Sequence, residues 1–580
     1  MVSSVGGINL VINGKPMTVA GGTTIKLAAE LAGIDIPTLC YHPDQEIKAN
    51  CRVCVVEVEG QRNLVPACAG LVSEGMVVKT STPRVIEARK TIIELLLAHH
   101  DQDCLHCIRN GICELQNLAA DYNIRQIPWK QFNRALPLDK SSPAMVRDPN
   151  KCVLCNRCVD ACGSLQTVYA LGMAERGFGT LVVPSLSQDL IDSPCVMCGQ
   201  CIHACPVGAI YEKEDTDELM AALADPTAIV VAQIAPAVRL AISEELGQEV
   251  GSLPMEKLVA GLKAVGFDYV LPTTFTADLT IMEEGNELLK RLQEGWELPL
   301  ITSCSPGWVN FCETFYPDQI NHLSTCKSPQ QMFGTLAKTY WANKMGIDPA
   351  KIYSVSIMPC VAKKYEAKRP EMNDSGYQDV DLVITTRELG RMFRMMSINP
   401  FQLDDGQMDG WMGEYTGAGV MFATTGGVAE AALRTLYEVV TGDQLEKLEF
   451  EDIRGMQGIK ATEVDLAGTK VKVAVAHGLD NARKLMDEVR AGKSPYQFIE
   501  IMACPGGCIG GGGQPLTSSN ELRVKRMQEL FAEDKATTVR KSHLNPEVQK
   551  LYENFLFEPL GEKGHHLLHT HYAPRIKRFM

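Results

Sequence analysis

Apolar and polar residues alternate with two different periods in the first hundred positions. Residues 8–20 alternate apolar and polar side chains around Asn13 and Gly14, which predicts a β-hairpin. Residues 24–33 and 82–98 repeat apolar residues at helical spacing. These two stretches predict helices, the first ended by a glycine and the second begun near Pro83.

The rhythm changes from about residue 225. Short apolar stretches at 228–235, 268–274, 351–359 and 471–478 alternate with helical stretches, which predicts α/β layering with a largely parallel sheet. The 580 residues exceed the usual size of one domain several times. We therefore expect a multidomain fold that combines α+β and α/β units.

Composition narrows the class of protein. A net charge of -14 argues against binding nucleic acid, whose phosphates would be repelled. We find no apolar run long enough to span a bilayer and no signal peptide at the start, so we expect a cytoplasmic protein without a membrane span. The 21 cysteines then favour metal or catalytic roles over disulfides, because the cytoplasm keeps thiols reduced.

The first group of cysteines follows the predicted hairpin and helix. It consists of Cys40, Cys51, Cys54 and Cys68. Four thiolates suit a 2Fe-2S centre, and their spacing resembles the β-grasp ferredoxin domain of respiratory complex I and of hydrogenase subunits. A zinc site is the alternative, because isolated C-x-x-C pairs often bind zinc.

A histidine joins the second group. Its members are His100, Cys104, Cys107 and Cys113. Histidine replaces thiolate on iron in Rieske centres, so this group can hold a 4Fe-4S cluster. His99 and His106 are close enough in sequence to compete with His100. We select His100 because its spacing resembles the cluster with three cysteines and one histidine that complex I and these hydrogenases share.

The strongest local pattern is a pair of C-x2-C-x2-C-x3-C runs, which is typical of bacterial two-cluster ferredoxins. In that arrangement the fourth cysteine of each run ligates the other cluster. One 4Fe-4S cluster is thus expected on Cys152, Cys155, Cys158 and Cys205, and the other on Cys195, Cys198, Cys201 and Cys162. Iron that is saturated with cysteine offers no open position to substrate, so we expect the chemistry elsewhere.

Three segments of the second half carry the remaining candidate residues. They are TSCSPGW (302–308), MPCVAKKYE (358–366) and EIMACPGGCIGGGGQP (500–515). Each alone is consistent with a buried cysteine near a turn. Together, and in this order, they resemble the signature segments of iron-iron hydrogenases. With the cluster groups included, the resemblance covers nearly the whole chain and is closest to the multi-cluster, NAD-linked, electron-bifurcating type.

The resemblance implies an H-cluster, which is a 4Fe-4S cubane bridged by a cysteine to a two-iron unit with carbon monoxide, cyanide and azadithiolate ligands. It implies that Cys360 and Cys504 hold the cubane and that Cys508 is the bridge. Residues implied around the two-iron unit are Lys363, Ala235, Pro236, Gln330, Met358 and Met502. The glycine run 510–513 lacks the lysine and hydroxyl of a P-loop, and we expect its backbone to pass close to the bulky cofactor.

One segment departs from the family pattern, in which two adjacent cysteines precede the proline. The first of these relays protons and the second ligates the cubane. Here Cys304 holds the first position and Ser305 the second. Either Cys304 becomes the ligand, or Ser305 ligates, or the site is altered. Serine oxygen is a harder and less usual iron ligand than thiolate, so we treat Cys304 as essential and leave its role open.

Hydrogen turnover needs carboxylates and hydroxyls that carry protons to a buried metal. The resemblance implies a path through Cys304, Glu284, Ser324, Glu287 and Arg291. Considered alone, the two glutamates and the arginine lie on one face of an amphipathic helix, where Glu287 and Arg291 would form an ordinary surface pair. The resemblance favours the path.

The remaining motifs have simpler interpretations. Cys312 and Cys326 match no ligand position and are expected to be structural. The histidine-rich stretch at 564–572 could suggest a metal site, but a packed terminal segment is the favoured interpretation.

The resemblance divides the chain into four units. They are a β-grasp 2Fe-2S domain (1–80), a 4Fe-4S domain with one histidine and three cysteine ligands (81–125), a two-cluster ferredoxin domain (140–215) and a large α/β H-cluster domain (222–580). The implied reaction is the reversible interconversion of H2 with protons and electrons.

The implied partners follow from what the chain lacks. Ferredoxin is one expected partner. The sequence has no Rossmann G-x-G-x-x-G after a strand, so NAD chemistry is expected from flavin- and NAD-binding and 2Fe-2S partner subunits. Maturation proteins are implied for the two-iron unit.

Two other classes remain. A complex I-type electron-transfer subunit does not predict the segments at 358–366 and 500–515. A hydrogen sensor or a non-catalytic iron-sulfur assembly protein is the third interpretation. The retained Cys304, Glu284 and Glu287 argue against it, whereas Ser305 keeps it open.

Overall fold

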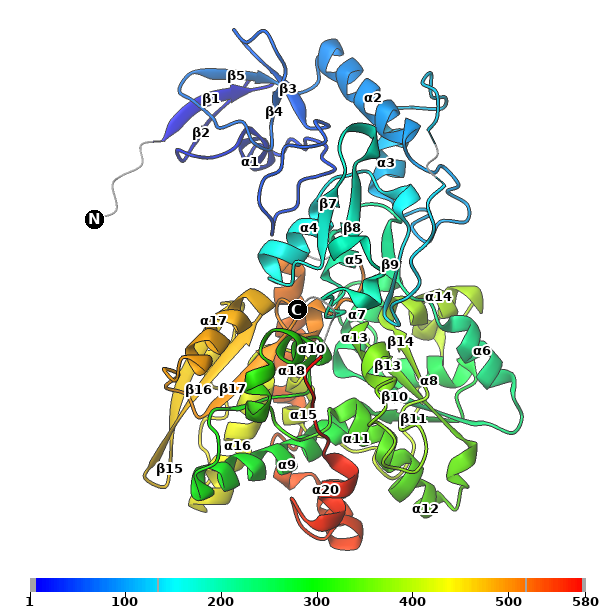
Figure 1. Cartoon of the computed structure of the whole chain (residues 1–580), viewed down its shortest axis with the longest axis vertical. Coiled ribbons are helices and arrows are strands. Elements are labelled where there is room, and N and C mark those ends of the chain that lie inside the picture. The colour runs from blue at the N-terminus through cyan, green and yellow to red at the C-terminus, as the bar shows by residue number, and fades with distance from the viewer. Residues whose placement is uncertain (1–6, 133–134, 517–518, 576–580) are drawn as a thin grey trace.

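The computed structural model describes residues 7–132, 135–516 and 519–575. Residues 1–6 of the predicted first unit, and 517–518 and 576–580 of the predicted last unit, lie outside the described residues. In Figure 1 the N-terminal units form an arm that rests on a larger body, and this body contains the strands and helices of the C-terminal half.

The N-terminal unit is a five-stranded sheet with the order β2-β1-β5-β3-β4. The predicted hairpin is confirmed: β1 and β2 pair antiparallel around Asn13 and Gly14, which have φ angles of 50° and 81°, as a tight hairpin turn requires. The predicted helix is α1, whose Ile25, Ala28 and Ala29 are buried. The bounds are β1 Ile8–Ile12, β2 Lys15–Val19, α1 Ile25–Leu31, β3 Val55–Val58, β4 Val65–Pro66 and β5 Met76–Lys79.

Helix α2 (Pro83–Ala98) confirms the second predicted helix and connects the sheet to the cluster units. The side chain of Thr82 caps its first turn by accepting a hydrogen bond from Val85 N, which satisfies a free backbone donor. The buried Arg89 donates to the carbonyl of Val55 at 2.8 Å and so fixes α2 to β3. Helix α3 (Glu114–Asp121) follows.

The next unit has two similar halves. Each half places a left-handed residue inside its cysteine run, Asn156 with φ 66° and Gly199 with φ 75°, and a short helix begins directly after it. Two antiparallel strand pairs, β6 with β9 and β7 with β8, complete the unit. The bounds are β6 Met145–Arg147, α4 Arg157–Asp160, β7 Leu171–Ala174, β8 Leu181–Pro184, α5 Gln200–Ala204 and β9 Ile210–Glu212.

The C-terminal half contains two four-stranded sheets, where the sequence indicated one. All four predicted strands are present. The first sheet, β11-β10-β13-β14, is parallel throughout. In the second, β12-β17-β16-β15, strand β15 runs antiparallel to β16. The bounds are β10 Ile229–Ile234, β11 Tyr269–Pro272, β12 Leu300–Ile301, β13 Ile352–Met358, β14 Leu382–Thr385, β15 Ile459–Leu466, β16 Thr469–His477 and β17 Phe498–Met502.

Helices surround both sheets, and the long helix α9 packs against α11, α15 and α16. The helices of this half are α6 Thr216–Ala224, α7 Pro236–Glu245, α8 Met255–Val265, α9 Thr273–Glu294, α10 Pro306–Phe315, α11 Pro329–Leu336, α12 Ala342–Met345, α13 Ala362–Ala367, α14 Thr386–Met395, α15 Gly417–Met421, α16 Gly427–Thr441, α17 Leu479–Arg490, α18 Asn520–Ala536, α19 Pro546–Leu551 and α20 Glu562–Leu568.

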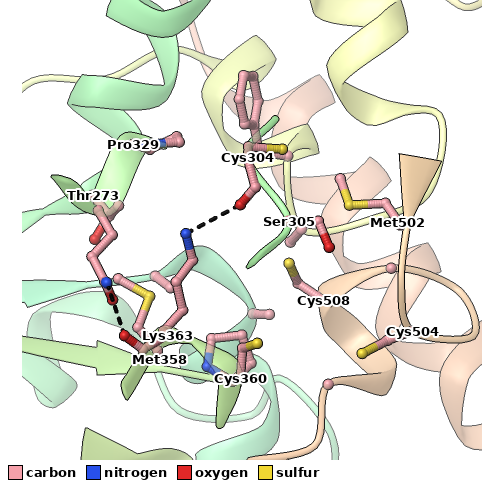
Figure 2. Close-up of a pocket in the computed structure, with 18 of the residues that line it drawn as sticks. Thr273, Cys304, Ser305, Pro329, Met358, Cys360, Lys363, Met502, Cys504 and Cys508 are labelled. Carbon is pink, nitrogen blue, oxygen red and sulfur yellow. Dashed lines mark hydrogen bonds between the residues drawn. The ribbon is translucent and has the colours of Figure 1, made fainter. Parts of the chain in front are cut away.

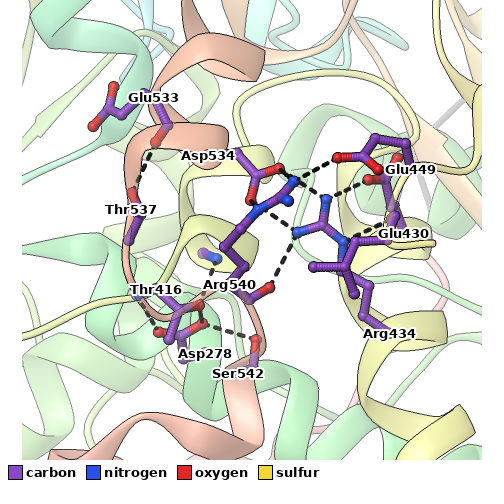
Figure 3. Close-up of polar contacts among 12 residues, drawn as sticks. Asp278, Thr416, Glu430, Arg434, Glu449, Glu533, Asp534, Thr537, Arg540 and Ser542 are labelled. Atoms are coloured by element: carbon purple, nitrogen blue, oxygen red, sulfur yellow. Dashed lines mark hydrogen bonds and ion pairs between the residues drawn. The ribbon is translucent and has the colours of Figure 1, made fainter. Parts of the chain in front are cut away.

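Buried charges join the last helices to this body (Figure 3). Arg434 of α16 pairs with Glu430 at 2.6 Å and with Asp534 of α18 at 2.9 Å. Asp278 of α9 accepts hydrogen bonds from Thr416 and Ser542, and burial raises the pKa of its carboxyl to about 6. Buried ions persist only when they are paired, so Arg434 fixes α18 against α16. Asp278 fixes α9 to the segments that precede α15 and α19. Among the described residues, no helix is both long and apolar enough to cross a bilayer.

Candidate functional site

A cavity lies between the two sheets of the C-terminal half. Its walls come from the ends of β10 and β13 in one sheet, from the ends of β12 and β17 in the other, and from the helices that follow these strands. Parallel strands bring their carboxyl ends to one edge, where α/β proteins bind ligands. All three segments singled out in the sequence therefore meet at this cavity.

Sulfur dominates the chemistry of the cavity. Cys360, Cys504 and Cys508 line it, together with Cys304 and Ser305. Cys304 and Ser305 are half-buried because they form part of the wall. In Figure 2 the Ser305 hydroxyl lies on the side of Cys508 and Cys504, whereas the Cys304 thiol points away from them. Burial raises the pKa of the Cys360, Cys504 and Cys508 thiols.

The other walls are mainly apolar. The residues expected around the two-iron unit are all present: Ala235, Pro236, Gln330, Met358, Lys363 and Met502. Lys363 Nζ donates to the Cys304 carbonyl at 3.1 Å and pairs with Glu366 at 2.8 Å. Gln330 accepts a hydrogen bond from Ser356 at 2.9 Å and donates to Glu366 at 3.0 Å. Lys363 thus places a cationic side chain in a mainly apolar wall.

A chain of buried polar side chains leads away from Cys304. Burial raises the pKa of the Cys304 thiol, and the nearby Glu284 raises it further. Burial, followed by the charge of Glu287, raises the pKa of Glu284 to about 8. Ser324 lowers that pKa by hydrogen bonding to Glu284, and it also donates to Glu287 at 2.9 Å. The structure therefore brings these four side chains together in the order that the resemblance implies.

Glu287 and Arg291 contradict the interpretation as a surface pair. Their side chains are only 6% and 5% exposed, and they pair at 2.6 Å. Arg291 also donates to the carbonyls of Asn321 and Leu323. These carbonyls come from the loop before α11, which covers the polar face of α9. Sequence periodicity identified the face but not its covering, because the covering segment lies about thirty residues further along the chain.

The first cysteine group is assembled at the end of the N-terminal sheet. Backbone N–H groups of Asn50 and Cys51 point at Cys40 Sγ, at 3.3 and 3.4 Å. The Cys51 thiol, together with these amides, lowers the pKa of Cys40 to about 5. The thiols of Cys54 and Cys68 hydrogen bond to each other. Four thiols held this closely, with amides directed at sulfur, suit an iron-sulfur group.

Burial separates the three histidines near the second group. The His99 ring stacks on Phe178, and the side chain of His106 is 83% exposed beside Asp103. His100 is buried, and its Nδ1 has no hydrogen-bond partner among the described residues. Burial also lowers its pKa, which keeps the ring neutral. A neutral ring with a free nitrogen is what a metal ligand requires, so the geometry favours His100.

The paired runs of cysteines surround two separate cavities. One cavity is lined by Cys152, Cys155, Cys158 and Cys205. The other is lined by Cys162, Cys195, Cys198 and Cys201. The fourth cysteine of each run thus lies in the other run's cavity, which is the grouping expected from the sequence.

The second of these cavities adjoins the large one. Cys504 Sγ lies 3.9 Å from the carbonyl oxygen of Cys198. A Cβ at Gly199 would lie 2.9 Å from Gly512 Cα, and one at Gly512 would lie 2.8 Å from the Cys198 oxygen. Gly512 therefore lets two backbones touch. Gly511 of the same run lines the large cavity, where the sequence led us to expect backbone close to a cofactor.

A second polar branch meets Glu287, and no sequence pattern indicated it. Thr325 N donates to Glu287 at 3.1 Å, and the Thr325 hydroxyl lies 2.8 Å from His569 Nδ1. His569 Nε2 lies 3.1 Å from Glu283. The Cys326 thiol lies beside both Glu287 and His569. These groups are far apart in the chain, so no local pattern could have joined them.

The remaining predictions on cysteines and histidines can be placed. Cys312 and Cys326 are fully buried. Cys312 contacts the Tyr316 carbonyl in α10 and lines none of the three cavities described above. The histidine-rich tail forms α20 and packs on the body, where His569 is 4% exposed and bridges to Cys326.

Comparison with known families gives matches along the chain. Residues 228–512 match the model described as "Iron only hydrogenase large subunit, C-terminal domain", and residues 520–575 match "Iron hydrogenase small subunit". The N-terminal third matches a 2Fe-2S iron-sulfur cluster binding domain (7–83), an NADH-ubiquinone oxidoreductase-G iron-sulfur binding region (89–128) and a 4Fe-4S dicluster domain (151–209).

Two named relatives are similar to this chain over nearly its full length. The NADP-reducing hydrogenase subunit HndD of Solidesulfovibrio fructosivorans is 48% identical, over 98% of this chain and 99% of that protein. Iron hydrogenase 1 of Clostridium pasteurianum is 40% identical, over 97% and 99%. The solved structure of an apo FeFe-hydrogenase HydA1 variant from Chlamydomonas reinhardtii has a TM-score of 0.57 and 44% identity, and covers 62% of this chain and 99% of that one.

Proposed function

Because the chain belongs to the iron-only hydrogenase family, we propose that it interconverts H2 with protons and electrons and exchanges the electrons with ferredoxin and, through partner subunits, with NAD or NADP. One observation supports this most: the cavity lined by Cys360, Cys504 and Cys508 adjoins a cysteine-lined cavity on one side and a buried proton path on the other. Electrons and protons would therefore reach the large cavity by separate routes.

The proposed cofactors follow the cysteine groups. We assign a 2Fe-2S cluster to the N-terminal unit, a 4Fe-4S cluster to the group with His100, two 4Fe-4S clusters to the paired runs, and an H-cluster to the large cavity. The residues fit the H-cluster, because soft sulfur donors suit iron-sulfur chemistry and the other walls are mainly apolar. When bound, this group supplies the iron at which H2 is split heterolytically.

The residues of the chain supply the proton route. Cys304 has the innermost thiol, and its raised pKa keeps it protonated. Glu284, with a pKa of about 8, can hold or release a proton near neutral pH, as a relay requires. Ser324 connects Glu284 to Glu287, and Arg291 fixes the position of Glu287. The apolar walls, including Met358 and Met502, exclude water around the reacting group.

Lys363 has an orienting role in this proposal. Its ammonium group is held between Glu366 and the Cys304 carbonyl. A fixed cation at this wall suits an anionic diatomic ligand such as cyanide. Ala235 and Pro236, at the end of β10, place backbone along the same cavity.

The name of one relative supports the choice of partners. HndD is an NADP-reducing hydrogenase subunit that matches this chain over 98% of its length. We propose that flavin- and nucleotide-binding subunits with a further 2Fe-2S protein receive electrons from the N-terminal clusters, and that the complex couples ferredoxin and pyridine nucleotide by bifurcation in the cytoplasm. Maturation proteins would install the two-iron unit.

Anaerobic H2 uptake with a viologen dye tests the catalytic part. Full-length protein made with maturation machinery should reduce the dye, and Cys304→Ala should lose that activity. Cys312→Ala is the matched control, since Cys312 is buried but lines none of the three cavities described here, and it should stay active. Inactive wild-type protein with its full iron and two-iron unit would refute catalysis. Dye reduction without NAD(P) reduction, even after partner subunits are added, would refute only the partner proposal.

A further inference from the structure

We propose that Ser305 Oγ is the fourth protein ligand of the cubane, and that Cys304 stays unligated at the inner end of the proton path. This assignment rests on the proposed function, because it assumes an iron-sulfur cubane in the large cavity. It concerns the one position at which the signature segments depart from the family pattern. The sequence left three alternatives for that position, and the side-chain directions distinguish them.

The two neighbouring side chains point to different parts of the cavity. Figure 2 shows the Ser305 oxygen on the side of the Cys508 and Cys504 sulfurs. Cys304 instead packs on an apolar cluster that includes Ala277 and Phe422. Cys360 packs on a different cluster, which contains Ala503. If Cys304 Sγ turned toward the other cysteines, the Cys304 and Ser305 side chains would have to exchange directions. The thiol would then no longer lie beside Glu284.

The hydrogen bonding of Ser305 supports the same assignment. Ser305 is the N-cap residue of α10, a position where serine usually accepts a bond from the first turn of its own helix. It makes no such cap bond. Its Oγ accepts from Ala503 N instead, at 3.3 Å, directly before Cys504. The hydroxyl is thus held beside a cubane cysteine, with lone-pair capacity left over.

The surroundings of Cys304 suit a proton carrier better than a ligand. After burial, Glu284 has the largest charge effect on the pKa of the Cys304 thiol and raises it, and the smaller effects of Lys363 and Cys508 follow. Around Cys504 the corresponding influences are Cys360, Cys198 and Cys508. The four-membered donor set is therefore Cys360, Cys504, Cys508 and the Ser305 oxygen, while Cys304 is left for the proton path.

One iron–Oγ bond forms, the Ser305 O–H bond breaks, and the proton leaves to solvent base; no electron is transferred. The resulting alkoxide is a harder donor than thiolate. It stabilises the more oxidised cubane, so we expect the cubane to be reduced at a lower potential than one with four thiolates.

The test compares variants of the full-length protein made with its maturation machinery. We would measure iron per chain, the infrared bands of the carbon monoxide and cyanide ligands, and the potential at which those bands shift on cubane reduction. The variants are Ser305→Cys, Ser305→Ala and Cys304→Ala. Ser303→Ala is the matched control, since Ser303 lies in the same loop, donates to the Cys326 carbonyl and does not line the cavity.

We expect Ser305→Cys to keep all iron and to shift the cubane transition to higher potential. Ser305→Ala should lose the iron and infrared bands of the H-cluster, whereas Cys304→Ala and Ser303→Ala keep both. Loss of the cubane in Cys304→Ala with retention in Ser305→Ala would overturn the assignment, as would Ser305 variants with the iron content and potential of the wild type. Wild-type protein without infrared bands would instead refute the proposed function itself.

Discussion

Glu284 offers the sharpest test of the proton path, because replacing one carboxyl oxygen by an amide nitrogen removes its ability to carry a proton. Replacing it by Gln keeps the size and the hydrogen bonding but removes the titratable group. Glu284 is 3% exposed and lies between Cys304 and Ser324. We expect Glu284→Gln to fold and to bind its clusters, yet to lose turnover.

The structure gives the size of the effect. Burial, followed by the charge of Glu287, raises the pKa of Glu284 from 4.5 to about 8, so ionising it in place costs up to about 5 kcal/mol more than in water. At neutral pH it therefore holds a proton that it can pass to either neighbour. Losing such a relay costs roughly 10²- to 10⁴-fold in rate, or about 3–5 kcal/mol in barrier.

The direction of the pH dependence follows from the same value. Below about pH 8 Glu284 is protonated and neutral, and above it the carboxylate forms beside Glu287. Wild-type turnover should decline as pH rises through this value. The folded chain also keeps a proton between pH 4.5 and about 8 that the unfolded chain has released, so this site's contribution to the free energy of unfolding falls as pH rises through that window.

The assay is anaerobic H2 uptake across a pH range that brackets the pKa of about 8, together with the infrared C=O stretch of a protonated carboxyl group. That band should disappear near pH 8 in the wild type and be absent in Glu284→Gln. Glu283→Gln is the control on the same helix, since Glu283 contacts Tyr552 and His569. Turnover of Glu284→Gln within about tenfold of the wild type, or no band that titrates, would refute the relay.

Two further substitutions test the assembly around the site. Arg387→Lys should lower the unfolding free energy, measured by urea titration, by about 2–4 kcal/mol. The reason is that lysine cannot replace the bidentate contact of the buried Arg387 with Glu212. The control is Arg394→Lys, at a side chain that is 51% exposed, and it should change the unfolding free energy by no more than about 0.5 kcal/mol. His100→Ala should lose about four iron atoms per chain by elemental analysis, whereas His106→Ala should lose none, and the reverse would move the ligand.

The sequence predicted the hairpin, the strands and the cysteine grouping because these depend on local spacing. Asn13 and Gly14 determine the turn, whatever surrounds it. The burial of Glu287 could not be predicted, because the segment that covers it is distant in sequence. The side-chain directions of Cys304 and Ser305 could not be predicted either, because a loop has no regular period that assigns adjacent side chains to different faces. Their directions depend on how α10 packs against Ala503.

The contact between Gly199 and Gly512 has a consequence for electron transfer. Tunnelling through protein weakens exponentially with the width of the barrier, and here the backbones of Gly199 and Gly512 approach each other directly. A methyl group at Gly199 would lie 2.6 Å from Val361 Cγ2 and 2.9 Å from Gly512 Cα, so the two units would have to separate to accept it. The absence of side chains at Gly199 and Gly512 thus keeps the tunnelling distance short between the proposed cluster on Cys198 and the proposed cubane.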